Sequence, residues 1–258
     1  MANAVAKTKK GDVAAFDASM FEQDAGQGNQ NISSDDLALP VLKLLSGLDP
    51  VLDTHETARK GDIYNTVSGE AISGKDGLSV IPCAYQRVFI QWLPRGSGSG
   101  APIKIYTPNE ARPKTERNSD DNKEYVVGGD GDYIEETHQH YVLVVKEDGS
   151  TETALIAMKS TQVKKSRKWN SMIQSVTMQG KNGPFTPPRF SHVYKIKSIA
   201  EENSKGSWHG WEMSREGPVQ EAAVYGQAKS FSESVLSGDV VVKHENEKTE
   251  NSSDDIPF

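Results

Sequence analysis

The chain has 258 residues and a hydrophobic fraction of 35%, which favours a loop-rich β domain with polar ends over a compact enzyme. Its single cysteine, Cys83, excludes an intrachain disulfide and a four-cysteine zinc site, and we expect it in the core. No stretch approaches the ~20 apolar residues of a membrane-spanning helix, and no apolar signal region follows the first lysines. We therefore expect a cytoplasmic protein without membrane contact.

The formal net charge of −7 is unevenly distributed. Residues 1–36 hold three basic and six acidic side chains, and residues 239–258 hold two and six, which leaves 24 of each sign in residues 37–238. Within this neutral body, the range Lys159–Lys197 has nine Lys or Arg and no Asp or Glu. This range predicts an anionic partner, whereas the polar composition of residues 1–36 and 239–258 predicts disorder.

The first half of the domain expected over residues 37–238 is dominated by strand patterns. Pro40 disfavours a helix and predicts an extended segment at Leu39–Leu45. The run GSGSG at Gly96–Gly100 predicts a flexible loop within a charged excursion over residues 94–124, and Asp148-Gly149 predicts a β-hairpin. The strands expected from β-branched and aromatic residues are 63–67, 78–93, 103–106, 125–127, 141–145 and 153–158.

The second half is expected to contain two helices and two strands. An amphipathic helix over 163–178 is predicted by apolar residues at i, i+3, i+4 and i+7, namely Trp169, Met172, Ile173 and Val176. Strands are expected at 190–199 and 208–213, and Pro218 and Gly238 delimit a last helix, Val219–Leu236. Several strands, one helix and two further strands predict a mainly β fold with a few helices. The expected architecture is an elaborated OB-fold-like, five-stranded Greek-key barrel with insertions and disordered termini.

The chain ends on two acids and an apolar tripeptide, Asp254-Asp255-Ile256-Pro257-Phe258. The acidic residues before this tip repel one another and keep the segment extended, so the ring of Phe258 is accessible to a pocket on another protein. Pro257 lowers the entropy lost on docking, and the α-carboxylate of Phe258 suits a basic pocket rim. The tip therefore predicts a protein partner.

This tip closely resembles the C-terminal tip of bacterial single-stranded DNA-binding proteins. The resemblance implies that Phe258 fills a basic-rimmed pocket on replication or recombination proteins, with Asp254 and Asp255 at the rim. It covers only the tip and the acidic segment before it. Around DLALPVLKLL and GDIYNTVSGE, the body is instead similar to single-stranded DNA-binding proteins of tailed phages, which implies the cytoplasm of a bacterial host.

Single strands are bound by cations along the phosphates and by aromatic rings under the bases. On the helix expected over 163–178, Lys164, Arg167 and Lys168 lie opposite the apolar stripe, so they face solvent and are candidates for phosphate contact. Trp169 is expected in the core. The other DNA-binding candidates of the acid-free range are Lys165, Arg189, Phe190, Tyr194, Lys195 and Lys197.

Two strands offer aromatic candidates. On 190–199, Phe190 and Tyr194 are expected to share one side, with Lys195 and Lys197 on the other, and it stays open whether the two rings stack on bases or fill the core. On 78–93 the residues that share a face with an aromatic and arginine mixture are Tyr85, Arg87 and Phe89. Such a mixture suits base stacking.

No catalytic motif stands out. The sequence has no phosphate-binding loop of the type G-x-x-x-x-G-K-[ST] and no carboxylate pair marked as a nuclease site, so we expect neither an enzyme nor a cofactor. His138 and His140 are expected on one face of a strand, but without a third ligand nearby we expect no metal site.

Three functions stay open. The first is a non-enzymatic, sequence-independent protein that coats single-stranded DNA in phage replication, recombination or repair and recruits partners through its tip. The second is a phage recombination protein that anneals complementary strands. The third is an interaction protein that carries the tip without binding DNA. The oligomeric state, including a homo-oligomer, also stays open.

Overall fold

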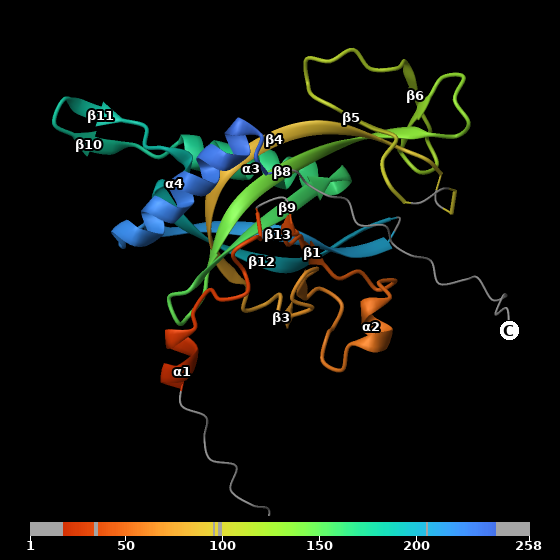
Figure 1. The fold of residues 1–258 in the computed structure, drawn as a ribbon. Coiled ribbons are helices and arrows are strands. Elements are labelled where there is room, and N and C mark those ends of the chain that lie inside the picture. The colour runs from red at the N-terminus through yellow and green to blue at the C-terminus, as the bar shows by residue number, and fades with distance from the viewer. Residues whose placement is uncertain (1–17, 34–35, 95, 98–99, 205, 241–258) are drawn as a thin grey trace, which may run out of the picture. The chain divides into compact units, whose positions relative to one another are not determined.

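The computed structural model describes residues 18–33, 36–94, 96–97, 100–204 and 206–240, and it divides into two units, Met1–Leu37 and Ala38–Phe258 (Figure 1). The described part of the first unit contains one short helix, α1 (Ala18–Gln23), followed by turns. The rest of the segments expected to be disordered, residues 1–17, 34–35 and 241–258, lies outside the described residues. Within the described ranges, no helix has the length and apolarity that crossing a membrane requires.

The second unit is mainly β, and its centre is a large antiparallel sheet (Figure 1). The five long strands are β4 (Leu78–Trp92), β8 (Tyr133–Val145), β9 (Thr151–Lys159), β12 (His192–Asn203) and β13 (Gly206–Pro218). They pair in the order β13-β12-β4-β8-β9, so β12, the fourth along the chain, returns beside β4, the first. This is a Greek-key connection. The sheet curls into a half barrel, and a register shift between Pro82 and Ala84 in the β4–β8 ladder marks a bulge of the kind that bends strands.

Short strands extend this frame. The charged excursion contains β5 (Lys104–Tyr106), which pairs with β4, and β6 (Thr115–Arg117) and β7 (Glu124–Val126), which continue the sheet beyond β8. A separate small sheet is formed by β1 (Leu42–Leu44), β2 (Ile63–Asn65) and β3 (Ala71–Ile72), with the one-turn helix α2 (Val51–Thr54) between β1 and β2. The segment after Pro40 is therefore extended, as the sequence predicts.

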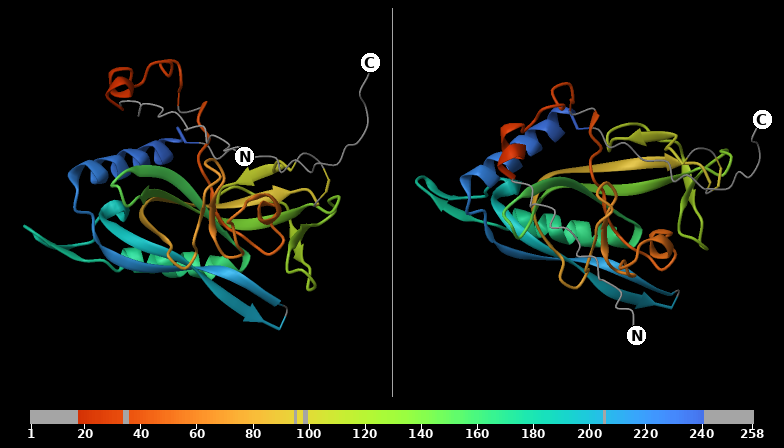
Figure 2. Two further views of the ribbon diagram at one scale, coloured as in Figure 1. Left: turned by 90° about the horizontal axis from the view of Figure 1, so that it is seen from below. Right: turned by 60° about the horizontal axis from the view of Figure 1, so that its bottom comes forward.

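Two helices cover opposite faces of the sheet (Figure 2). Helix α3 (Val163–Gln174), preceded by the 3-10 turn η2 (Ser160–Gln162), buries Trp169 and Ile173 against Val142 of β8. Helix α4 (Ala222–Ser237) packs on the other face, against residues such as Tyr141 and Leu143. Neighbouring residues of β8 thus point to different cores because side chains alternate along a strand.

Two predictions that rest on glycine are confirmed, a hairpin turn and the end of a helix. The hairpin joining β8 to β9 turns at Gly149, whose φ is 81°, and the Asp148 side chain accepts a hydrogen bond from the Ser150 N–H at 2.9 Å. Helix α4 ends at Gly238, which adopts the left-handed conformation with φ of 88°, a helix stop that glycine supplies without strain.

Candidate nucleic-acid interface

The outer side of α3 is basic, as predicted. Lys164, Arg167 and Lys168 are exposed, while Trp169 on the inner side is fully buried, which confirms the expected division of the helix. Lys165 differs from its neighbours because it is half-buried and its amine lies 2.6 Å from the carboxylate of Glu201. Its charge is already compensated within the protein.

A second basic surface lies on β4. Tyr85, Arg87 and Phe89 share one face, since they are paired across the ladder with His140, His138 and Glu136 respectively. The guanidinium carbon of Arg112 lies 3.6 Å from the centroid of the Phe89 ring, and that of Arg87 lies 5.7 Å from it. Both arginines are exposed and Phe89 is half-buried. An aromatic ring at the surface thus has two cations close to it.

Glu136 joins the two surfaces. It lies directly opposite Phe89 on β8, and its carboxylate oxygen is 3.5 Å from a guanidinium nitrogen of Arg167 on α3. We call Arg87, Phe89, Arg112 and Arg167 the arginine–phenylalanine patch. Burial acts to raise the pKa of Glu136, but the hydrogen bond from His138 and the nearby charges of Arg167 and Arg87 prevail and lower it. The carboxylate therefore stays ionised and pairs with Arg167.

Arg112 is the member of the patch that sequence reasoning missed. It lies in the excursion of residues 94–124, where no periodicity marks it. The excursion is held to β4 by the β4–β5 pairing, in which Phe89 lies opposite Tyr106, and this fold-back carries Arg112 to the Phe89 ring. Only the tertiary structure brings these two residues together.

Beneath the surface, a chain of hydrogen bonds runs from η3 (Arg189–Ser191) through the sheet and α3 to Glu136. Arg189 donates to Nδ1 of His140 at 3.0 Å, which leaves His140 neutral with its Nε2–H donating to Ser166 at 2.7 Å. Ser166 in turn donates to Nδ1 of His138 at 2.7 Å, and His138 donates from Nε2 to Glu136 at 2.9 Å. One direction of donation thus runs through the whole chain, while the buried Nε of Arg189 has no hydrogen-bond partner among the described residues.

Burial shapes the electrostatics of this chain. The pKa of His140 is held well below its ordinary value by burial first, and then by the charge of Arg189 and by His138. Burial also lowers the pKa of Arg189 to about 10. Tyr85 lies against the chain, with its hydroxyl 3.0 Å from Nδ1 of His138 and its ring 5.5 Å from the Arg189 guanidinium. Arg189 and Tyr85, both candidates from sequence, thus fix α3 to the sheet from the inside.

The prediction that Phe190 and Tyr194 share one side of a strand was wrong. The strand begins at His192, Phe190 lies in η3, and a register shift between Val193 and Tyr194 changes the alternation. Phe190 packs edge-on against Tyr225 of α4, with ring centroids 5.3 Å apart. Tyr194 is only 1% exposed and lies in the core on the α3 side. Of the two alternatives, stacking on a base or filling the core, its ring therefore does the second.

Two candidate lysines lie on the other side of the sheet from the arginine–phenylalanine patch. Lys195 and Lys197 are half-buried on the side of β12 opposite Tyr194, as expected from alternation. Helix α3 ends at Gln174, before the expected residue 178, and an unpredicted hairpin of β10 (Met178–Gly180) and β11 (Gly183–Phe185) projects from the rest of the unit (Figures 1 and 2). Its Phe185 ring is 45% exposed, and it belongs to the same acid-free range.

The remaining predictions concern a metal site and the C-terminal tip. Within the part of the chain that the structure describes, no group of three or more His, Cys, Asp or Glu side chains is arranged to hold a metal ion. The tip at Asp254–Phe258 lies outside the described residues.

The fold and this surface define a mainly β protein with a curled Greek-key sheet and a basic, aromatic face beside α3. The family model of the Pam3 phage gp34-like protein matches residues 8–241, and the chain belongs to that family. No curated protein and no solved structure matches the chain.

Proposed function

We propose that this protein binds single-stranded DNA without sequence preference and without catalysis, coats it in phage replication, recombination or repair, and recruits partner proteins through Asp254–Phe258. The observation that carries the proposal is the continuity between the basic side of α3 and the arginine–phenylalanine patch, which meet at Glu136. Exposed cations next to a half-buried aromatic ring at the surface match what a single strand requires, namely charges for its phosphates and a ring for its bases.

The sheet topology supports the same proposal. The five long strands form a Greek key, and α3 stands between the third, β9, and the fourth, β12. We assign them to an elaborated OB-like barrel in which β1–β3, β5–β7 and β10–β11 are insertions. OB barrels bind oligonucleotides on the sheet face, and here Arg87 and Phe89 lie on the face that α3 also covers.

Different residues take different parts of the strand in this proposal. Lys164 and Lys168 contact phosphates, since both are exposed and lie on a helix without an acidic residue. Phe89 stacks on a base, either beside Arg112 or in the place of its guanidinium, because the arginine covers one side of the ring. The exposed Phe185 on the projecting hairpin offers a second ring.

The test is a titration of labelled poly(dT) at increasing salt, followed by fluorescence anisotropy. The double variant K164A/K168A should lower the slope of log K against log salt by about 1.4, because each phosphate contact on a single strand contributes about 0.7. The matched control is K75A/K229A, which removes two exposed charges outside the acid-free range and should leave the slope unchanged.

Three outcomes decide the matter. No binding by the unaltered protein at low salt would reject DNA binding and leave the interaction-protein alternative. Equal slopes for the two double variants would move the DNA path away from α3. Rapid pairing of complementary strands by the unaltered protein would instead favour the annealing protein.

A further inference from the structure

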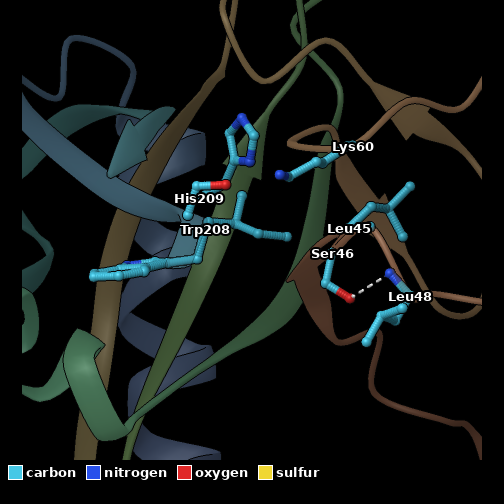
Figure 3. Close-up of a pocket in the computed structure, with 9 residues that line it drawn as sticks. Leu45, Ser46, Leu48, Lys60, Trp208 and His209 are labelled. Atoms are coloured by element: carbon cyan, nitrogen blue, oxygen red, sulfur yellow. Dashed lines mark hydrogen bonds between the residues drawn. The ribbon is translucent and has the colours of Figure 1, made fainter. Parts of the chain in front are cut away.

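A pocket of about 340 Å³ lies between the segment after β1 and the beginning of β13 (Figure 3). Its apolar walls come from Leu44, Leu45, Leu48 and Trp208, and its polar groups from Ser46, Lys60 and His209. Leu48 is 90% exposed at this site, so its side chain is open to a ligand from solvent. The volume is within the range of small-ligand sites.

The walls of the pocket are fixed in place. Two backbone hydrogen bonds fix the segment after β1. The Leu45 N–H donates to the carbonyl of Asp62 at 2.9 Å, and the Leu45 carbonyl accepts from the N–H of Gly61 at 2.8 Å. A Cβ at Gly61 would lie 2.5 Å from the His209 ring, so only glycine allows this close approach. On the other side, the indole of Trp208 donates to Glu201 at 3.0 Å. The pocket is therefore preformed.

Two nitrogen groups stand at the apolar walls. The Lys60 side chain is exposed, extends toward His209 in Figure 3, and has no carboxylate partner among the described residues. The Nδ1 atom of His209 is buried and has no hydrogen-bond partner in the same part of the chain. Leucines and an indole beside an amine and an imidazole suit a ligand that combines an apolar group with a carboxylate.

We propose that this pocket binds the chain's own C-terminal segment, Asp254–Phe258, with the Phe258 ring between Leu48 and Trp208 and its carboxylate on Lys60. The segment has the chemistry that the pocket requires, since three apolar residues end in an α-carboxylate. The reach is sufficient, because the 18 residues after Val240 extend up to about 60 Å, more than the roughly 45 Å across a domain of this size.

Docking of the tip in the pocket of its own chain controls whether the tip is available to partner proteins. Attachment through 18 residues gives an effective concentration in the millimolar range, so a free peptide affinity of about 0.1 mM is enough to keep the tip docked most of the time. A partner protein must then compete with the pocket for the same three residues. Docking of the tip in the pocket does not require DNA binding, whereas its effect on partner capture rests on the proposed function of the tip.

The test uses a fluorescent peptide of residues 249–258, titrated with the full chain and with a chain lacking Ile256–Phe258. The shortened chain should bind the peptide with a Kd near 0.1 mM, and the full chain at least tenfold more weakly because its own tip occupies the pocket. An amidated peptide should bind the shortened chain about tenfold more weakly than the free acid, since it has no carboxylate for Lys60.

Pocket variants identify the site. In the shortened chain, L48A and K60A should each weaken peptide binding at least fivefold, while the exposed control K75A should not; all three residues are exposed, so folding is preserved. Absence of peptide binding at 2 mM protein, or equal binding by L48A, K60A and K75A, would overturn the proposal. A concentration-dependent dimer of the full chain that disappears on tip deletion would overturn docking within one chain.

Discussion

Acid should destabilise the protein through His140, and replacing this residue should remove that effect. In the folded state His140 is fully buried, and Nδ1 must stay unprotonated to accept from Arg189, so its pKa lies well below 6.5. In the unfolded chain a histidine titrates near 6.5. Below that pH, His140 binds a proton in the unfolded state but stays neutral in the folded state. The free energy of unfolding therefore falls as the pH decreases through 6.5 and is insensitive to this residue above about pH 7.5.

The size of the effect follows from proton linkage. One histidine that stays neutral in the folded state contributes a loss of about 2 kcal/mol between pH 7.5 and pH 5.0. The variant H140Q keeps an amide for hydrogen bonding but does not titrate, so its loss over the same interval should be about 2 kcal/mol smaller. Urea unfolding at both pH values, followed by tryptophan fluorescence, measures this difference. His192, whose pKa is lowered by burial and by Arg215, is common to both proteins and cancels.

If H140Q and the unaltered protein lose the same stability within 0.5 kcal/mol, the neutral hydrogen-bond chain through His140 is not the source of the acid sensitivity.

Four further results are expected. W169A should cost about 3–5 kcal/mol in urea unfolding, because the indole is fully buried; a cost below 1 kcal/mol would contradict its core position. Burial raises the pKa of the Cys83 thiol to about 12, so the native protein should react with a disulfide reagent at least 100-fold more slowly than the urea-unfolded chain, and equal rates would refute this. F89A should weaken poly(dT) binding by about 5- to 150-fold with an unchanged salt slope, since a stacked base is worth about 1–3 kcal/mol. Deleting Ile256–Phe258 should abolish partner capture in pull-down assays while DNA affinity stays equal or rises slightly; a strong loss of DNA affinity would argue against separate DNA and partner surfaces.

Helix α3 shows what the sequence determines locally. Its apolar residues recur with the period of a helix, so the buried position of Trp169 and the exposure of Lys164, Arg167 and Lys168 follow from the pattern without tertiary information. The hairpin turn at Gly149 and the helix stop at Gly238 are equally local, because a positive φ favours glycine in any context.

Other features depend on contacts between distant parts of the chain. The alternation expected for Phe190 and Tyr194 fails because a 3-10 turn and a register shift interrupt the strand, and neither has a clear signal in the sequence. The strands β10 and β11 have three residues each and contain glycine and proline, which strand patterns exclude. Arg112 reaches Phe89 only through the fold-back of a charged excursion.

The buried polar chain explains how a helix with little apolar surface keeps a defined orientation. Ser166 and Trp169 are one turn apart on the inner side of α3, and both contact His140, one by a hydrogen bond and the other by a stacked ring at 4.6 Å. A buried polar network constrains geometry more than apolar contact does, because displacement leaves its groups unsatisfied at a cost of about 1–3 kcal/mol each. Since Arg167 follows Ser166 directly and meets Glu136 at the end of the same chain, the network that anchors the helix also sets the position of its outer charges. His138 and His140, which the sequence expects on one face of a strand, thus help to position the basic surface.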